Sequence, residues 1–255
     1  MLIDLTDQVA LVTGSAHRVG RAIALELAKC GVNIQVHYNN SNANEVRDTL
    51  HEIKSEGVDA FAVQADISQP DGVEKVMEAV KENFGKLNIL VNSASLFPTM
   101  DLLEVSLESW NETMNVNLRA PFLFTQAAAH YMAENEPSGG NIVNICDQGA
   151  FAPWPKHPQH GISKAGLWML TQVSAVSLGP DIRVNAVAPG PVVKSSDMTD
   201  EQWTQMGNDL PLKRTGSPAD VGRAVVYLCQ NSFLTGILLP VNGGEHLVVP
   251  HGKNK

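Results

Sequence analysis

Seven short apolar runs alternate with longer segments of helical periodicity, and this alternation constrains the fold more than any other feature. Continuous apolar runs bounded by turn residues are typical of strands that are buried on both faces. Strands that alternate with helices build βαβ units, so the chain is expected to form one parallel sheet with helices on both faces. The runs occupy residues 8–14, 32–38, 58–66, 87–94, 140–146, 182–190 and 236–244.

The segments between these runs repeat apolar residues every three or four positions, which predicts amphipathic helices. The two clearest series are Val46, Leu50 and Ile53, and then Val73, Val76, Met77, Val80 and Phe84. Gly31, Gly57 and Gly85 follow such segments, where helices commonly end. The sequence contains no linker or repeat, so residues 1–255 are expected to form a single doubly wound α/β domain of the Rossmann type. Only a tail at about 250–255 is expected to be disordered.

Composition excludes several classes of protein. A net charge of −9 argues against nucleic acid or an anionic membrane as a partner. The three cysteines are far apart and lie in apolar surroundings, which indicates reduced residues rather than disulfides or a metal site. The chain has neither a membrane-length apolar run nor a signal-peptide pattern, so a cytoplasmic location is expected.

The first apolar run continues into "TGSAHRVG", a glycine-containing loop that opens a helix. Such a loop presents backbone N–H groups and the helix dipole to a diphosphate. Gly14 permits a tight turn, and Gly20 lets the helix pack closely on the strand. Two glycines alone fit an ordinary strand-to-helix turn equally well. Their position on the first strand of an α/β chain favours dinucleotide binding.

Five motifs resemble the short-chain dehydrogenase/reductase family in order and spacing, from about Leu5 to Gly244. They are "TGSAHRVG", "LVNSAS", "MNVNL", the lysine after His160 and "NAVAPGPV". The resemblance implies a Rossmann-type domain that binds NAD or NADP and assembles as a homotetramer or homodimer. Within the family the chain is most similar to pteridine reductases, through Arg18, "HYNNS" at 37–41, the "S-x-F-P" segment at 95–98, and Asp147 in place of the usual serine.

The end of the second run discriminates between NAD and NADP. An NAD site usually places a carboxylate there to bind the ribose hydroxyls, but this chain has no acid before Glu45. The nearby polar residues could instead donate hydrogen bonds to a 2′-phosphate, which favours NADP(H). These residues are Arg18, Asn39, Asn40 and Ser41. A polar turn with an exposed arginine is the alternative, and Asn40 replaces a residue that is usually basic in pteridine reductases.

The resemblance assigns further residues to the cofactor. Asp66 would contact the adenine, or would simply cap a helix. Asn92 and Ala94 would leave room for the ribose, although a buried asparagine that satisfies backbone groups is an alternative. The remaining assigned cofactor residues are Val19, His37, Lys164, Pro189, Gly190 and Val192.

The family's catalytic Asn, Ser, Tyr and Lys match Asn117, Asp147, His160 and Lys164. His160 and Lys164 are four residues apart and therefore neighbours on one helix face. The histidine has three interpretations. In the first, it replaces tyrosine as general acid. In the second, the tyrosine role is lost and the protein binds cofactor without efficient turnover. In the third, the loop "APWPKHPQ" shifts the match, so that Lys156 or His157 enters the site.

Asp147 also indicates the substrate. An ionised carboxylate repels the oxyanion formed from a ketone but accepts hydrogen bonds from ring N–H groups. We therefore predict hydride transfer from NADPH to a C=N bond of a pterin-like heterocycle, with Ser95 and Phe97 also contacting the substrate. A weak dinucleotide-binding sensor or partner subunit, and a carbonyl reductase, are the alternatives. By the same resemblance, the segment at about 191–215 is expected to be the mobile substrate loop. Helices at 102–133 and 160–179 would form the subunit interface, although their apolar stripes could equally belong to the core.

Overall fold

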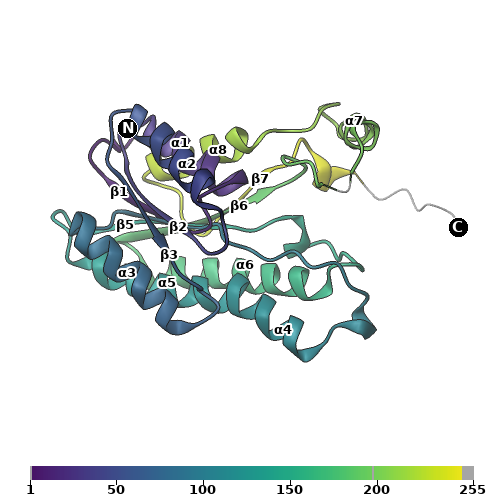
Figure 1. Cartoon of the computed structure of the whole chain (residues 1–255), viewed down its shortest axis with the longest axis horizontal. Helices are drawn as coiled ribbons and strands as arrows, with labels where there is room; N and C mark the ends of the chain where they lie inside the picture. The colour runs from purple at the N-terminus through teal and green to yellow at the C-terminus, as the bar shows by residue number, and fades with distance from the viewer. Residues whose placement is uncertain (1, 197, 249–255) are drawn as a thin grey trace, which may run out of the picture.

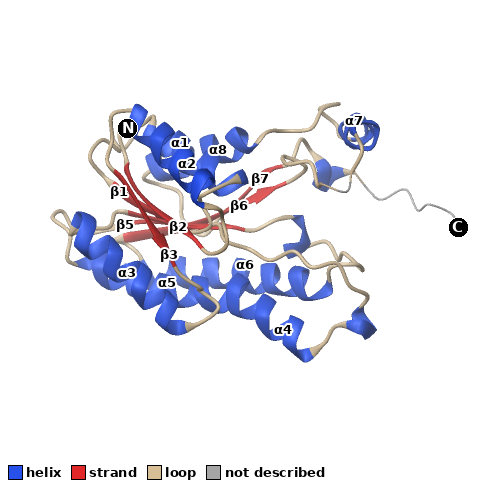
Figure 2. Cartoon of the chain, viewed as in Figure 1, coloured by secondary structure: helices blue, strands red, loops and turns tan. Residues whose placement is uncertain are grey.

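In the computed structural model, which describes residues 2–196 and 198–248, seven parallel strands form one sheet in the order β3-β2-β1-β4-β5-β6-β7 (Figures 1 and 2). Each predicted apolar run contains one strand, so the prediction of a single doubly wound domain with a seven-stranded parallel sheet is confirmed. The strands are β1 (Val9–Val12), β2 (Asn33–Tyr38), β3 (Ala60–Gln64), β4 (Ile89–Asn92), β5 (Gly140–Ile145), β6 (Ile182–Pro189) and β7 (Leu238–Val241).

Most strands are shorter than the predicted runs, because the chain leaves the sheet at the carboxyl edge to form loops. β1 ends at Val12, and the next residue, Thr13, binds the loop that follows β4. The Thr13 Oγ1 atom accepts hydrogen bonds from the backbone N–H groups of Ser93 at 2.9 Å and Ala94 at 3.0 Å. The loops after β1 and β4 are thereby held side by side.

Helices cover both faces of the sheet, as Figure 1 shows. One face carries α1 (Arg18–Ala28), α2 (Ala43–Ser55) and α8 (Pro218–Gln230), and the other carries α3 (Pro70–Phe84), α5 (Ala120–Ala133) and α6 (Pro158–Leu178). Ile23 and Leu27 belong to the core on the first face, and Val76 and Phe124 to the core on the second. The predicted helical series near residues 46–53 and 73–84 are thus α2 and α3.

The helical region predicted at 102–133 is divided into several elements. Residues Leu102–Glu104 form a 3₁₀ turn, α4 spans Leu107–Met114, and Asn115–Arg119 form a π-helical turn before α5. Pro121 lacks a backbone N–H group, which interrupts regular helical hydrogen bonding at this point. The π turn carries Asn117, one of the predicted catalytic residues.

The predicted substrate loop at 191–215 contains a short helix, α7 (Asp200–Asp209), closed by a capping box between Thr199 and Gln202. Asp197 and the predicted tail at 250–255 lie outside the described residues. Cys30, Cys146 and Cys229 are free thiols, as predicted, although Cys30 is only partly buried. Within residues 2–196 and 198–248, no helix is both long and apolar enough to cross a membrane.

Candidate active site

A cavity of about 850 Å³ opens at the carboxyl edge of the sheet, lined by the loops that follow β1, β2, β3 and β4. The strand order reverses between β1 and β4, and ligands of open α/β sheets bind at such a switch point. Most of the predicted cofactor residues line this cavity, as do the predicted substrate residues Ser95 and Phe97. The cofactor residues among them are Gly14, Arg18, Val19, Gly20, His37, Asn39, Asn40, Ser41, Asp66 and Ala94.

The glycine loop is packed as tightly as its two glycines permit. Gly14 has a φ of +65°, and a Cβ at this position would lie 2.9 Å from the Ala94 Cα. A Cβ on Gly20 would lie 2.2 Å from the Gly14 carbonyl oxygen. His17, at the N-cap of α1, makes no side-chain capping bond, so this helix start keeps N–H groups for an anion.

His37 fixes the glycine loop from below. Its Nδ1 accepts a hydrogen bond from the Gly14 N–H at 3.2 Å, and its Nε2 donates to the Ala65 carbonyl oxygen at 3.1 Å. Burial lowers the pKa of His37 to about 4, against the opposing effects of Ala65 and the Asp66 charge. The ring is therefore neutral at pH 7, and its main role is to position the loop.

The end of the cavity that is formed by the loops after β1 and β2 is lined by N–H and O–H donors. Arg18 is exposed, adopts a φ of +52°, and forms no ion pair within the described part of the chain. His17, which sequence reasoning missed, contacts the Ser41 hydroxyl through Nδ1 at 3.0 Å and lines the cavity beside Arg18. Glu45 also lines this end, but its carboxylate accepts a hydrogen bond from the Asn42 N–H at the start of α2.

Five of the predicted cofactor residues lie outside the lining of this cavity, and one of them, Lys164, is on α6. Asn92 is buried, and its Nδ2 donates to the Asn144 Oδ1 at 2.8 Å, so it joins β4 to β5 and does not line the cavity. The sequence left open a buried asparagine that satisfies backbone groups; Asn92 is buried, but its partner is a side chain. Pro189 ends β6, and Gly190 and Val192 follow it; all three lie outside the cavity lining, at the same carboxyl edge.

The four predicted catalytic residues come together beside Leu96. His160 and Lys164 are one turn apart on α6, and Asp147 follows β5. His160 Nε2 forms an ion-paired hydrogen bond with Asp147 Oδ2, and His160 Nδ1 donates to the Leu96 carbonyl oxygen at 2.8 Å. The Asn117 Nδ2 lies 3.4 Å from the same Nδ1, so both ring nitrogens of His160 contact protein groups.

The charges around Asp147 set its protonation. Burial raises the pKa of Asp147, but the hydrogen bond from His160 and the positive charges of Lys164 and His160 outweigh it, so the pKa lies below the usual value. Asp147 is therefore a carboxylate at neutral pH. The Lys164 Nζ donates to the Ile145 carbonyl oxygen at 2.7 Å, which holds the buried ammonium behind the site.

Asn117 fixes the loop that joins these residues to the cavity. Its Oδ1 accepts from the Leu96 N–H at 2.8 Å, and its Nδ2 donates to the Leu96 carbonyl oxygen at 2.9 Å and the Ser163 hydroxyl at 3.1 Å. The family resemblance implies a relay water on this asparagine. In this structure its amide atoms bind protein groups and position Leu96 against His160.

An aromatic cluster covers His160. The Phe97 ring stacks on His157 with centroids 3.9 Å apart and meets His160 edge-on at 4.5 Å, while Trp154 lies parallel to His160 at 6.3 Å. His157 Nδ1 donates to the Pro98 carbonyl oxygen, and the exposed Lys156 pairs with Asp101. Neither residue takes the place of His160 beside Asp147, so the shifted match is not supported.

Sequence reasoning also missed Glu245, which follows β7. A Cβ on Gly190 would lie 2.8 Å from the Glu245 Oε2, so this carboxylate lies against the turn after β6. Burial and the neighbouring charge of Asp147 both raise the pKa of Glu245. The only sequence signal was its place directly after Gly243 and Gly244, at the carboxyl end of a strand.

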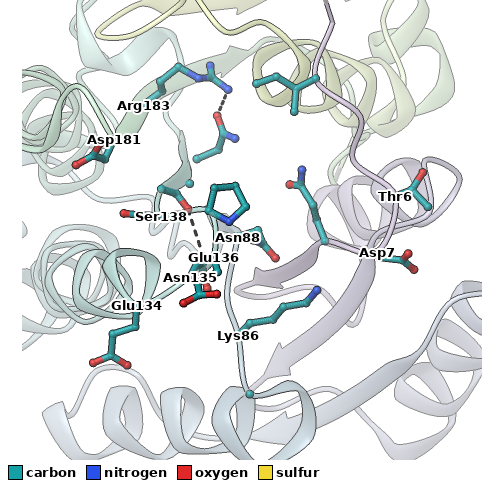
Figure 3. Close-up of a pocket in the computed structure, with 17 residues that line it drawn as sticks. Thr6, Asp7, Lys86, Asn88, Glu134, Asn135, Glu136, Ser138, Asp181 and Arg183 are labelled. Carbon is teal, nitrogen blue, oxygen red and sulfur yellow. Dashed lines mark hydrogen bonds between the residues drawn. The ribbon is translucent and has the colours of Figure 1, made fainter.

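A second cavity, of about 670 Å³, opens at the opposite edge of the sheet (Figure 3). Its polar groups mainly serve the local structure. Arg183 donates to the carbonyl oxygens of Leu228 and Leu234 and to Asn141, and Asn135 donates to the Leu87 carbonyl oxygen. This cavity lacks the convergent donors found at the carboxyl edge.

The fold and the cavity define a dinucleotide-binding α/β protein, and comparison with known proteins identifies its family. A family model described as enoyl-(acyl carrier protein) reductase matches residues 14–246. Glucose 1-dehydrogenase 2 of Bacillus subtilis is 34% identical over 97% of this chain and 98% of its own length. The 3-oxoacyl-(acyl-carrier-protein) reductase FabG of Staphylococcus aureus is 35% identical over 93% and 98%.

The chain is also similar to a solved structure over its whole length. The FolM alternative dihydrofolate reductase 1 of Brucella canis, complexed with NADP, superposes with a TM-score of 0.91 at 31% identity and covers 99% of both chains. The chain belongs to the short-chain dehydrogenase/reductase family of oxidoreductases.

Proposed function

We propose that this protein uses NADPH to reduce a C=N bond in a pterin-like heterocycle. The observation that carries the proposal is the buried pair of Asp147 and His160 beside Phe97. Reduction of C=N places a hydride on carbon and a proton on nitrogen. The hydride comes from the nicotinamide, and the proton from the hydrogen-bonded Asp147–His160 pair, which regains a proton from solvent.

The charge of this site favours a nitrogen substrate over a ketone. Hydride transfer to a ketone leaves negative charge on oxygen, and the Asp147 carboxylate would repel it. Ring N–H groups, by contrast, donate to a carboxylate. The FolM neighbour supports this assignment through its name, whereas FabG and glucose 1-dehydrogenase are equally close relatives with other named substrates.

Several residues would hold NADP(H). Arg18, His17 and Ser41 would contact the 2′-phosphate, with Asn39 and Asn40 beside them, because this end of the cavity presents donors and its one acid is turned to its own helix. The start of α1 would face the diphosphate, and Asp66 the adenine. Lys164 would reach the nicotinamide ribose, and Pro189, Gly190 and Val192 would border the nicotinamide. Three neighbours in the solved structures are NADP or NADPH complexes.

One observation favours a second candidate, a dinucleotide-binding protein with weak turnover. His160 is only 2% exposed, and both of its ring nitrogens are engaged. Direct proton transfer from His160 to a substrate therefore requires Asp147 as the intermediary. If Asp147 does not relay the proton, the site binds cofactor and ligand without efficient reduction.

Turnover and binding assays distinguish these functions. NADPH oxidation is measured with a dihydropterin and with a panel of aliphatic ketones, and the NADPH dissociation constant is measured in parallel. Dihydropterin reduction without ketone reduction supports the proposal. Tight NADPH binding without any turnover supports the second candidate, and reduction of ketones alone indicates a carbonyl reductase.

We also propose that the chain forms a homodimer or homotetramer in the cytoplasm. The α6 helix exposes apolar residues at helical spacing, and an exposed apolar stripe of this kind is typical of an interface. The residues are Ile162, Met169, Val173 and Val176, which are 47–86% exposed in the single chain. Light scattering on the purified protein measures the number of subunits.

A further inference from the structure

Glu245 is held in a fixed position at the carboxyl edge of the sheet. It opens the 3₁₀ turn Glu245–Leu247, directly after Gly244, which has a φ of +87°. The Asn242 Oδ1 accepts hydrogen bonds from the Gly244 N–H at 3.2 Å and from His246 Nδ1 at 3.0 Å. This network fixes the backbone on both sides of Glu245 at the carboxyl edge of the sheet.

The Glu245 carboxylate lies close to the turn after β6. Gly190 leaves space for it, since a Cβ there would approach the Glu245 Oε2 to 2.8 Å. Pro189 and Gly190 are the residues that we expect to border the nicotinamide. The side chain of Glu245 is half-buried at this edge and forms no hydrogen bond or ion pair with the residues that the structure describes.

Asp147 approaches from the neighbouring strand. Its Oδ2 is occupied by His160, whereas its Oδ1 is buried, and the backbone N–H of Gly149 also helps to lower the pKa of this carboxyl. Asp147 follows β5 and Glu245 follows β7, the two strands on either side of β6, and burial together with the Asp147 charge raises the pKa of Glu245. His160 and Lys164 are the positive groups on the Asp147 side, and they already bind Asp147 and the Ile145 carbonyl oxygen.

We infer that Glu245 is a specificity-determining residue that binds an N–H donor edge of the substrate ring, of the amidine or 2-amino-heterocycle type. An unpaired, half-buried carboxylate needs donors, and an N–C–N edge with two N–H groups matches a carboxylate in the way that a guanidinium does. A simple ketone offers no such donors. Glu245 thus selects the ring, while Asp147 and His160 carry out the proton transfer. This inference rests on the proposed reduction of a pterin-like ring.

The test compares a dihydropterin with its 2-dimethylamino analogue, which keeps the ring and lacks the two amino N–H donors. The wild-type protein should show a kcat/KM ratio of about ten or more in favour of the dihydropterin. Glu245→Gln, which keeps the size of the side chain and removes its charge, should reduce this ratio by about tenfold or more, chiefly through KM. Glu245→Asp, which keeps the charge, should retain part of the discrimination.

Two controls accompany these variants. Glu82→Gln changes an exposed glutamate on α3 and should leave the ratio unchanged. The NADPH dissociation constant of Glu245→Gln should equal that of the wild type. If the dihydropterin is reduced but Glu245→Gln leaves the ratio unchanged, the role of Glu245 is wrong and the proposed reaction stands. If the wild type neither reduces nor binds either pterin, the proposed reaction fails, and the role of Glu245 fails with it.

Discussion

The buried His37 should make folding stability depend on pH, because its pKa differs between the folded and unfolded chain. The pKa falls from 6.5 to about 4 on burial. Between these values the unfolded chain binds more protons, so stability rises with pH. The contribution of His37 is complete above about pH 6.5 and is lost as the pH falls toward 4. Protonation would also remove the Nδ1 acceptor from the Gly14 N–H.

The magnitude follows from the two pKa values. One pKa unit corresponds to about 1.4 kcal/mol, so His37 should cost the folded state roughly 2 kcal/mol between pH 7 and pH 5, and about 3 kcal/mol below pH 4. In a domain of this size, 2 kcal/mol corresponds to a decrease in Tm of roughly 4–8 °C. Urea unfolding at several pH values, followed by circular dichroism, measures the effect.

His37→Asn isolates this contribution. The asparagine Oδ1 can occupy the place of Nδ1 and accept from Gly14, but the side chain does not titrate. The variant should lose about 2 kcal/mol less than the wild type between pH 7 and pH 5. His51→Asn, which changes an exposed histidine on α2, is the matched control and should follow the wild type. Equal pH slopes for wild type and His37→Asn would refute the reasoning.

Three further predictions concern cofactor and catalysis. NADPH should bind at least tenfold more tightly than NADH, a difference of about 1.4 kcal/mol, and Arg18→Ala should remove most of it; equal affinities of the native protein in a fluorescence titration would contradict the assignment. His160→Ala should lower kcat for the dihydropterin by about 10²–10⁴, because Asp147 then loses its proton partner; an unchanged kcat would exclude the pair as proton source. Gly20→Ala should destabilise the fold by about 1–3 kcal/mol and weaken NADPH binding, since the new Cβ would lie 2.2 Å from the Gly14 carbonyl oxygen; a native melting temperature would show that the loop can relax.

The arrangement of the strands was predictable because each buried strand leaves a continuous apolar run. The π-helical turn before α5 was harder to predict from the sequence, because the apolar spacing continues through residues 115–119 while the backbone widens to a π turn. That difference affects the site directly, because the π turn places the amide of Asn117 against Leu96. Apolar periodicity reports which face is buried, and it is insensitive to one extra residue in a helical turn.

The site was predictable where residues share a helix or a loop. His160 and Lys164 were placed together by their spacing, and Arg18 by its position in the glycine loop. Contacts between distant segments could not be predicted in this way. Gly190 and Glu245 are joined only because β6 and β7 are neighbours in the sheet, and a lone glutamate after two glycines gives no local indication of that partner. His37 was assigned to the cofactor, and only the structure shows its hydrogen bonds to Gly14 and Ala65.

The family resemblance aligns His160 with the usual tyrosine, and we propose that the groups around it suit a histidine. A neutral phenol donates one proton and needs a neighbouring lysine to favour its anion, whereas an imidazolium needs an anion beside it. Asp147 provides that anion, and the Leu96 carbonyl oxygen binds the second N–H of the ring. Changing His160 alone leaves Asp147 without its partner, and changing Asp147 alone leaves the buried His160 without its partner, so both single changes should be costly. The double change Asp147→Ser with His160→Tyr should therefore be less destabilising than the sum of the single changes. Additive losses of unfolding free energy would show that the two residues act independently.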